Sequence, residues 1–340
     1  MSRRGAGVLA GALAVVLVAL GVGAGVSSRG SGSAGLMASP EALATVASTC
    51  GREHRARARY AHVIWIWLEN HSFDSVIGSR AAPFTNRLAE SCGLATNYHN
   101  VTHPSLPNYI AATSGGTQGI TSDCQPQECS RDVPSVFGQV AAAGMTWASY
   151  QESMPGTCDL DEGSGSRPDG DYAPRHDPAV YFLPLRPDCH RRVVPLGLPA
   201  SGALAHALES DALPAFSFVT PNLCNDTHDC PVASGDAWLA RWLPRIVASP
   251  AYRTGGTVIF VTWDEGEGGS SGDCSLNTSD VGCHVATLVV SPSTPRGTRS
   301  GELYNHYSLL KTTEQLLGIG RYLGHANDTG TNSMRPAFRL

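Results

Sequence analysis

Short apolar runs that end in polar residues recur along the chain and predict buried β-strands. One run is HVIWIWLEN, residues 62–70, and a second lies in TVIFVTWDEGEGG, where Val258–Thr262 are apolar or β-branched. A third, HVATLVVSP, begins at residue 284 and stops at Pro292. Such runs are typical of parallel strands, which are covered on both faces of the sheet. Their polar ends are expected to meet solvent, where sheets of this class bind ligands.

Helical periodicity lies between and after these runs. The segments SVFGQVAAAG, ALAHALES and DAWLARWLPRIVAS carry apolar residues at helical spacing, and HYSLLKTTEQLLGI does so near the end, with Gly318 closing it. Strands that alternate with helices predict an α/β fold, a three-layer α/β/α sandwich around a largely parallel central sheet. Residues 151–190 and 264–283 are rich in Gly, Asp and Pro, and we expect them to form long loops.

The N-terminal segment has the pattern of an export signal. Arg3 and Arg4 precede an uncharged apolar run, residues 5–26, and a stretch rich in Ser and Gly follows. This order predicts a signal peptide cleaved near Ala24, or a retained membrane anchor, because about 20 apolar residues span a bilayer. We expect a protein that is secreted or anchored on the outer face of the cytoplasmic membrane. The predicted parts are a signal peptide or membrane anchor at 1–26, a linker with a short helix at 27–58, and a single catalytic domain at 59–340.

Composition and charge favour a globular enzyme over a disordered or nucleic-acid-binding protein. Hydrophobic residues make up 42% of the chain and charged residues 16%, which suits a packed globular enzyme. The formal net charge of −5 gives no sign of a nucleic-acid partner. The sequence gives no basis for naming a protein partner.

The cysteine pattern predicts disulfides. All ten cysteines lie beyond residue 49, and after an export signal an even number indicates pairing in an oxidising compartment. The alternative is a zinc site, but the chain contains no CxxC pair. Spacing leaves the connectivity open: Cys124 and Cys129, Cys224 and Cys230, and Cys274 and Cys283 are close in sequence, and the other four can pair as Cys50 with Cys92 and Cys158 with Cys189.

Paired oxygen donors follow two of the predicted strands. Glu69 and Asn70 end the first strand, and Asp264 and Glu265 follow the second. Carboxylate and amide oxygens suit a hard divalent cation. Two adjacent carboxylates also repel each other unless a cation or a shared proton intervenes. The structural alternative for Glu69 and Asn70 is a capped strand end.

Ser105 is a candidate nucleophile. Pro104 and Pro107 bracket it in THPSLPNY and constrain the backbone around the hydroxyl. The following run NYIAATSG is expected to form a helix just beyond the serine, and its N-terminus would favour a bound anion. A proline-rich turn with a capping serine is the structural alternative.

Histidines accompany the acidic residues in the later motifs. PNLCNDTHDCP places Asp226 and His228 between two cysteines that are six positions apart, which suggests metal ligation or acid/base chemistry. A solvated acidic turn is the alternative for this loop. His284 begins the third predicted strand, and His306 begins the last predicted helix.

Six motifs occur in order along the chain, namely ENHSFD, THPSLPNY with TSG behind it, YAPRHDP, NDTHDC, TWDEGEG and NHYSLLKTTEQLLG. Together they resemble the bacterial phosphoesterase family that contains secreted acid phosphatases and phospholipases C, within the alkaline phosphatase superfamily. The resemblance spans about Tyr60 to Gly320 and implies an alkaline-phosphatase-like fold.

The resemblance also implies roles for individual residues. Ser105 occupies the place of the residue that attacks phosphorus. The ligands of a divalent metal ion, whose identity stays open, would be Glu69, Asn70, Ser105, Asp264 and Glu265. The histidines near the transferred phosphoryl group would be His103, His228 and His306. Four further residues fall in similar motifs with less defined roles: Asp123, His176, Asp226 and His284.

Two departures from the family pattern favour its phosphatase branch. Many phospholipase members have ENRSFDH, where this chain has His71 and Ser75, and the chain is shorter than those phospholipases, with no evident C-terminal β domain. We therefore expect an exported, metal-dependent acid phosphatase that cleaves small phosphomonoesters through a phosphoserine. Protonated histidines, with an ordinary pKa of about 6.5, would favour an acidic optimum. The alternatives are a phospholipase C acting on phospholipids and a non-catalytic, disulfide-bonded surface binding protein.

Overall fold

A computed structural model describes residues 39–163, 170–210, 212–268, 272–274 and 279–340. These residues belong to one compact unit. The expected signal peptide or membrane anchor, residues 1–26, lies outside the described residues, as do residues 27–38 of the expected linker. Among the described helices, none combines the length and the hydropathy of a membrane span.

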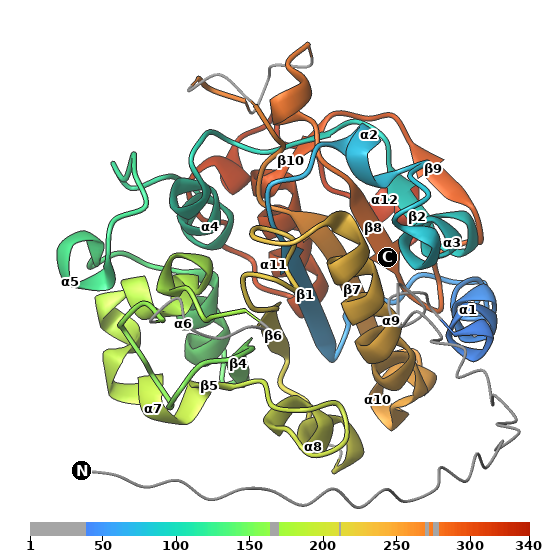
Figure 1. Ribbon diagram of the computed structural model, residues 1–340, viewed down its shortest axis with the longest axis horizontal. Helices are drawn as coiled ribbons and strands as arrows, with labels where there is room; N and C mark the ends of the chain where they lie inside the picture. The colour runs from blue at the N-terminus through green and yellow to red at the C-terminus, as the bar shows by residue number, and fades with distance from the viewer. Residues whose placement is uncertain (1–38, 164–169, 211, 269–271, 275–278) are drawn as a thin grey trace, which may run out of the picture. The chain divides into compact units, whose positions relative to one another are not determined.

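An eight-stranded sheet forms the centre of this unit (Figure 1). Its strand order is β5-β4-β6-β1-β7-β8-β2-β9, and β8 is the strand that runs antiparallel to both of its neighbours. The expectation of a largely parallel central sheet is confirmed. The strands are β1 (His62–Leu68), β2 (Gly93–Ala95), β4 (Trp147–Gln151), β5 (Val193–Pro195), β6 (Phe216–Thr220), β7 (Thr257–Trp263), β8 (Thr287–Val290) and β9 (Thr298–Ser300), with β3 (Tyr98–His99) and β10 (Tyr304–Asn305) as a separate parallel pair.

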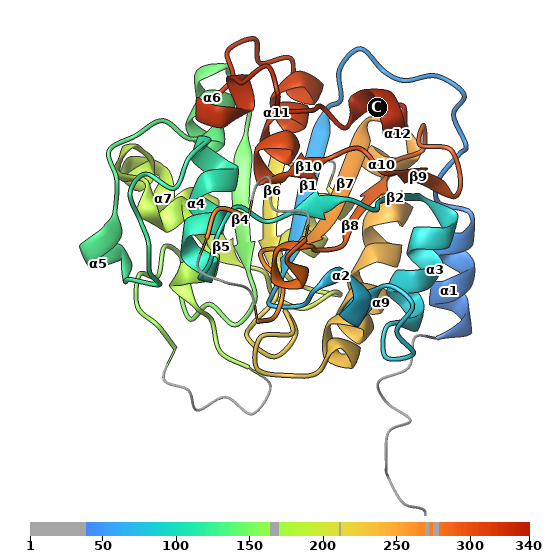
Figure 2. The same cartoon turned by 90° about the horizontal axis from the view of Figure 1, so that it is seen from above.

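Helices cover both faces of the sheet, as Figure 2 shows. One layer contains α4 (Ser105–Ser114), α6 (Val136–Ala142) and α11 (His306–Leu317), which contact one another. The other contains α1 (Pro40–Ala47), α3 (Pro83–Ser91), α8 (Ala203–Glu209), α9 (Val232–Ala248) and α10 (Pro250–Arg253). The shorter helices are α2 (Phe73–Val76), α5 (Pro126–Cys129), α7 (Cys189–Arg192) and α12 (Arg335–Phe338), with 3₁₀ turns at Pro174–His176, Pro178–Tyr181, Leu183–Asp188, Val281–Cys283 and Gly324–Asn327.

The three predicted strands are present as β1, β7 and β8. Their apolar runs are buried on both faces, as continuous hydrophobic strands require. The sequence did not predict β4 or β6, which are runs of five residues each. Helix α4 begins on Ser105 itself rather than just beyond it.

Strand β1 anchors the helical layer that carries the serine. The Nε1–H of Trp65 donates a hydrogen bond of 2.9 Å to the hydroxyl of Thr313 in α11. The ring of Trp67 lies 4.9 Å from the ring of Tyr109 in α4 and 4.7 Å from the ring of His306 in α11. These two tryptophans alternate along the strand with residues that face the opposite layer. They therefore hold α4 and α11 against the end of β1.

The cysteines form five disulfides, all within the described residues: Cys50–Cys92, Cys124–Cys129, Cys158–Cys189, Cys224–Cys230 and Cys274–Cys283. The prediction of disulfides rather than a zinc site is confirmed. Cys50–Cys92 links the segment after α1 to the end of α3, while Cys224–Cys230 and Cys274–Cys283 close short loops beside the strand ends.

The disulfides should differ in what they contribute to stability. Cys50–Cys92 closes a separation of 42 residues and Cys124–Cys129 one of 5. Chain entropy predicts that replacing both members of the first pair by alanine lowers the free energy of unfolding by about 4 kcal/mol, against about 2 kcal/mol for the second pair. Urea unfolding of both double variants measures this, and equal losses would contradict the loop-length argument.

Candidate active site

The parallel pairing of β1 and β7 brings two carboxylates together. Leu68 lies opposite Trp263 in the sheet register, so Glu69 and Asp264 follow at the same edge. The backbone N–H of Asp264 donates to the carbonyl of Leu68 at 3.0 Å. Both acidic side chains are fully buried, whereas the strand ends were expected to meet solvent. Loops and the start of α4 cover this edge of the sheet.

Ser105 is the first residue of α4 and is 3% exposed. Its hydroxyl donates a hydrogen bond of 3.0 Å to Oε2 of Glu69. The position at a helix N-terminus brings it near the positive end of the helix dipole, where an anion is favoured. Ser105, the candidate nucleophile, is therefore in direct contact with Glu69, a candidate metal ligand.

The start of α4 is fixed by two polar side chains. Asn108 accepts from the backbone N–H groups of Val101 and Thr102 at 2.9 and 3.0 Å, and its amide donates to Oε2 of Glu265 at 3.1 Å. Asp123 accepts from the N–H of Leu106 at 2.9 Å. Asp123 thus satisfies a free amide of the first helical turn, while Asn108 joins the serine loop to the Asp264–Glu265 pair.

The clustered carboxylates disfavour one another's charge. Burial, and then the charges of Asp264 and Asp226, raise the pKa of Glu69 well above its usual range. Burial and the neighbouring Glu265 raise the pKa of Asp264 to about 8. Burial and Asp123 raise the pKa of Glu265 to about 8 as well. Desolvation and like charge act in the same direction here, and a bound cation would relieve both.

Two buried oxygens point to where a cation fits. Oδ1 of Asn70 and Oδ2 of Asp264 are buried and have no hydrogen-bond partner among the described residues. Buried polar atoms without partners are rare unless a ligand or ion satisfies them. Asn70 also has a φ of 51°, a left-handed conformation, and its N–H donates to Oδ1 of Asp264 at 3.1 Å. Carboxylate and amide oxygens form a donor set for a hard divalent ion.

A buried chain of side chains holds the other oxygen of Glu69. The hydroxyl of Tyr109 donates to Oε1 of Glu69, and Nε2 of His176 lies 3.4 Å from the same oxygen. Nδ1 of His176 lies 3.1 Å from Oδ2 of Asp226. The ring of His176 also stacks on that of Tyr109, with centroids 5.5 Å apart. Glu69, His176 and Asp226 have ligand atoms that all lie within 4.8 Å of one another.

Tyr109 and Asn108 were missed by sequence reasoning. A signal was available, because Asn108 and Tyr109 lie three and four residues after Ser105 and so share its face of a helix. The sequence did not show whether α4 would begin at the serine, and without that starting point the shared face is not evident.

His103 lies beside the serine and next to the second carboxylate pair. Its Nδ1 is 3.0 Å from Oε2 of Glu265, and its Nε2 is buried without a hydrogen-bond partner among the described residues. Burial lowers its pKa. One ring nitrogen is thus held in place while the other remains available.

His306 has a different environment from the one expected. Its Nε2 lies 2.6 Å from the carbonyl oxygen of Asp264 and its Nδ1 lies 3.1 Å from the hydroxyl of Tyr98. The residue is fully buried, and burial lowers its pKa to about 4. With both nitrogens engaged inside the protein, the ring supports the end of β7. Its expected place near the phosphoryl group stays a prediction.

His228 and His284 make contacts outside the Ser105–Glu69 pair. His228 is partly exposed, with Nδ1 2.6 Å from Asp229 and its ring 5.6 Å from that of His176. His284 bonds the carbonyl of Thr96 at 3.1 Å and stacks on Phe73. His228 therefore lies beside His176. His284 instead links the segments that carry Phe73 and Thr96.

The sequence model of the phosphoesterase family matches residues 79–320, more than half of the chain. The chain belongs to this family. The expected enzyme class, a phosphoric ester hydrolase, is confirmed, and a binding protein without catalysis is not supported.

Individual relatives agree with this assignment. The phosphatidylinositol-3-phosphatase of Mycobacterium tuberculosis is 34% identical over 260 residues, which cover 76% of this chain and 78% of that protein. The phosphate-repressible acid phosphatase of Penicillium chrysogenum is 28% identical over 280 residues, covering 79% of this chain but only 61% of the fungal enzyme. The chain thus spans less than two thirds of that relative.

Solved structures confirm the fold. A protein in the alkaline phosphatase superfamily from Vibrio parahaemolyticus superposes with a TM-score of 0.52 at 12% identity, over 85% of this chain and 78% of that chain. At this identity the similarity establishes the fold alone. The expected alkaline-phosphatase-like architecture is therefore confirmed, independently of the site residues.

Removing the Tyr109 hydroxyl should impair the position of Glu69. For Tyr109→Phe, we expect kcat of this phosphoesterase on p-nitrophenyl phosphate to fall about tenfold with little change in KM, because groups that orient a ligand carboxylate typically contribute 10- to 100-fold. Tyr252→Phe is the matched control, since Tyr252 is buried and donates to the carbonyl of Thr49 away from the site. A Tyr109→Phe variant as active as the control would contradict the positioning role.

Proposed function

We propose that this phosphoesterase is an exported, metal-dependent acid phosphatase that cleaves phosphomonoesters through a phosphoserine at Ser105. The observation that carries the proposal is the contact of the Ser105 hydroxyl with Glu69, at a helix N-terminus and beside buried carboxylates whose pKa values are raised by burial and by one another's charge. A nucleophile needs an adjacent acceptor for its proton and a site for the anion it attacks. Both are next to Ser105.

In the first step, Oγ of Ser105 forms a bond to phosphorus and the bond from phosphorus to the alcohol oxygen breaks. Oε2 of Glu69 faces the hydroxyl proton, because it already accepts that hydrogen bond. Nε2 of His103 is the available donor for the leaving oxygen, with Nδ1 oriented by Glu265. Water then cleaves the phosphoserine and regenerates the hydroxyl.

The metal ligands in this proposal are Glu69, Asn70, Ser105, Asp264 and Glu265. A divalent ion there would supply charge stabilisation for the phosphoryl oxygens and would lower the pKa of the serine hydroxyl. The chain's own contribution is to bury the unpartnered oxygens of Asn70 and Asp264 at the two neighbouring strand ends, one of which also carries Glu69. Asn108 and Tyr109 hold two of these carboxylates from the helix side.

Protonated histidines no longer carry the expectation of an acidic optimum. Burial lowers the pKa of His103 and lowers that of His306 to about 4, which disfavours the charged form of both rings. The acid phosphatase proposal is supported instead by the fungal relatives that carry that name. The mycobacterial relative named for a phosphatidylinositol phosphate is also a monoesterase, which favours monoesters over diesters.

Export is part of the same proposal. Five disulfides indicate an oxidising compartment, and the apolar N-terminal segment has the pattern of a signal. A secreted enzyme, or one held on the outer face of the membrane by residues 1–26, fits both observations.

Ser105→Ala should abolish turnover of p-nitrophenyl phosphate, because the variant lacks the atom that accepts the phosphoryl group. Ser114→Ala is the matched control: Ser114 lies in the same helix, is 4% exposed and donates to the carbonyl of Ile110. Mass spectrometry of acid-quenched enzyme should find a phosphorylated Ser105 peptide in wild type. Near-normal activity of Ser105→Ala would overturn the nucleophile assignment.

Chelation of the metal should abolish activity and lower the melting temperature. A ligand that binds only the folded state raises the melting temperature, so the chelated protein should melt at a lower temperature and regain both properties with an added divalent ion. Asp264→Asn should lower the bound metal measured by elemental analysis, while the surface variant Asp188→Asn should not. Full activity after verified removal of all metal would refute the metal requirement.

A further inference from the structure

An arginine-rich segment leads into β1 and is not used by the mechanism above. Residues 51–59 read GREHRARAR, and their four arginines are all exposed, whereas Glu53 is the single carboxylate among them. This positive charge is concentrated in a chain whose formal net charge is −5. A local charge of one sign on a surface of the other sign attracts an anionic partner to that place.

Arginines from two other elements join this segment. Nη2 of Arg335, in α12, donates to the carbonyl of Arg57 at 2.9 Å, and its Nε donates to the backbone oxygen of Leu340 at 3.1 Å. Nη2 of Arg57 donates at 2.7 Å to the carbonyl of Thr254, which directly follows the exposed Arg253 of α10. The arginine surface is defined as Arg52, Arg55, Arg57, Arg59, Arg253 and Arg335.

Neighbouring groups compensate little of this charge. Arg57 pairs with Glu53 at 3.2 Å, and both side chains are partly exposed. The side chains of Arg55 and Arg59 make no hydrogen bond or ion pair with any residue that the structure describes. Arg335 contacts the segment through a neutral carbonyl, which fixes the guanidinium group without cancelling its charge. The surface therefore remains strongly positive.

The arginine surface and the catalytic site lie at opposite ends of the same strands. The segment directly precedes β1, whereas Glu69 directly follows it. Strand β7 is parallel to β1 and in register, so Arg253 lies before its start and Asp264 follows its end. A strand of seven residues, the length of β1, spans about 20 Å. A partner bound to the arginine surface therefore leaves Ser105 uncovered.

The chemistry of the arginine surface favours phosphate groups presented on a broad surface. Guanidinium groups form charge-assisted, bidentate hydrogen bonds with phosphate oxygens. Arg55, Arg57 and Arg59 alternate with Ala56 and Ala58, which are small and exposed. Small residues between the arginines let several guanidinium groups approach one anionic layer together. Phospholipid head groups form such a layer, and clustered arginines bind it electrostatically.

Chain length permits contact with a membrane. Residues 27–38 separate the apolar run at 5–26 from Ser39, where the described chain begins. A fully extended chain of that length reaches about 40 Å. A chain whose apolar run is held in a bilayer can therefore place the arginine surface on the same bilayer.

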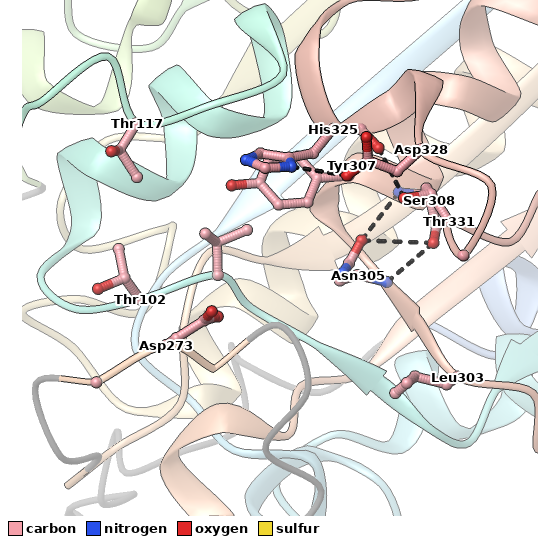
Figure 3. Close-up of a pocket in the computed structure, with 13 residues that line it drawn as sticks. Thr102, Thr117, Asp273, Leu303, Asn305, Tyr307, Ser308, His325, Asp328 and Thr331 are labelled. Atoms are coloured by element: carbon pink, nitrogen blue, oxygen red, sulfur yellow. Dashed lines mark hydrogen bonds and ion pairs between the residues drawn. The ribbon is translucent and has the colours of Figure 1, made fainter.

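We infer that the arginine surface docks on anionic phospholipid head groups and turns the Ser105 end of the sheet away from the membrane. The cavity of about 610 Å³ in Figure 3 belongs to that outward end, because Thr102 in its wall directly precedes His103. The inference goes beyond the proposed function, since it states where the enzyme binds and which way it faces. A docked enzyme acts on phosphoesters in the surrounding solution.

The test measures how the full chain partitions between solution and sedimented vesicles. The apolar run binds neutral and anionic vesicles alike, so the informative quantity is the ratio of two partition coefficients. One is for phosphatidylcholine mixed with phosphatidylglycerol, and the other is for phosphatidylcholine alone. For wild type the ratio should be about 100 at low salt and approach one in about 0.5 M NaCl, because salt screens the charges. Arg55→Gln combined with Arg59→Gln should lower it about twentyfold without changing the melting temperature.

The matched control is Arg80→Gln combined with Arg87→Gln, which removes two exposed arginines elsewhere and should leave the ratio unchanged. A wild-type ratio near one, equal ratios for both double variants, or binding to soluble polyphosphate but not to anionic vesicles would overturn the inference. Vesicle-bound wild type should hydrolyse p-nitrophenyl phosphate within about twofold of the free enzyme, and loss of turnover on binding would overturn the orientation. If the free enzyme is inactive, the proposed function fails, while sedimentation still decides the docking surface.

Discussion

The in-register pairing of β1 with β7 is the constraint on which the site depends. It places Glu69 and Asp264 side by side at one sheet edge, and the helices around that edge exclude water from both. Two desolvated carboxylates in contact are unfavourable by themselves. The surrounding elements contribute polar contacts to this pair. Asn70 has a left-handed backbone conformation, and its N–H donates to Asp264, while His306 of α11 contacts the carbonyl of Asp264. The cluster is thus stable only as part of a larger polar arrangement.

The two oxygens of Glu69 have separate roles. Oε1 is engaged by Tyr109 and faces His176, while Oε2 is presented to Ser105. One helix contributes to both sides, because Ser105 and Tyr109 lie one turn apart on the same face of α4. The spacing inside SLPNY therefore has a physical reason: it lets one helical turn carry the candidate nucleophile Ser105 and the tyrosine that holds Glu69. His176 and Asp226, whose motifs had no defined role, complete the support behind Oε1.

Much of this arrangement was predictable from the sequence, and the limits have physical causes. Continuous apolar runs identified β1 and β7, and with them the positions of Glu69 and Asp264. The strands β4 and β6 were missed because WASYQ and FSFVT mix polar and apolar residues although every side chain is buried. The antiparallel direction of β8 depends on chain connections that periodicity does not contain. Burial was the main omission: it lowers the pKa of His306, a residue that the sequence alone presents as an ordinary histidine at a helix start.

Two of the disulfides border the catalytic cluster rather than the periphery. Cys224–Cys230 closes the loop that carries Asp226 and His228, and the Cys274–Cys283 sulfurs lie within 4.8 Å of His103. The loop that supports Glu69 and the surroundings of His103 are thus secured by bonds that form only by oxidation. While its thiols are reduced, the newly made chain lacks the covalent closures beside its own site. In the proposed exported enzyme, these closures would form only after the chain leaves the reducing compartment in which it is synthesised.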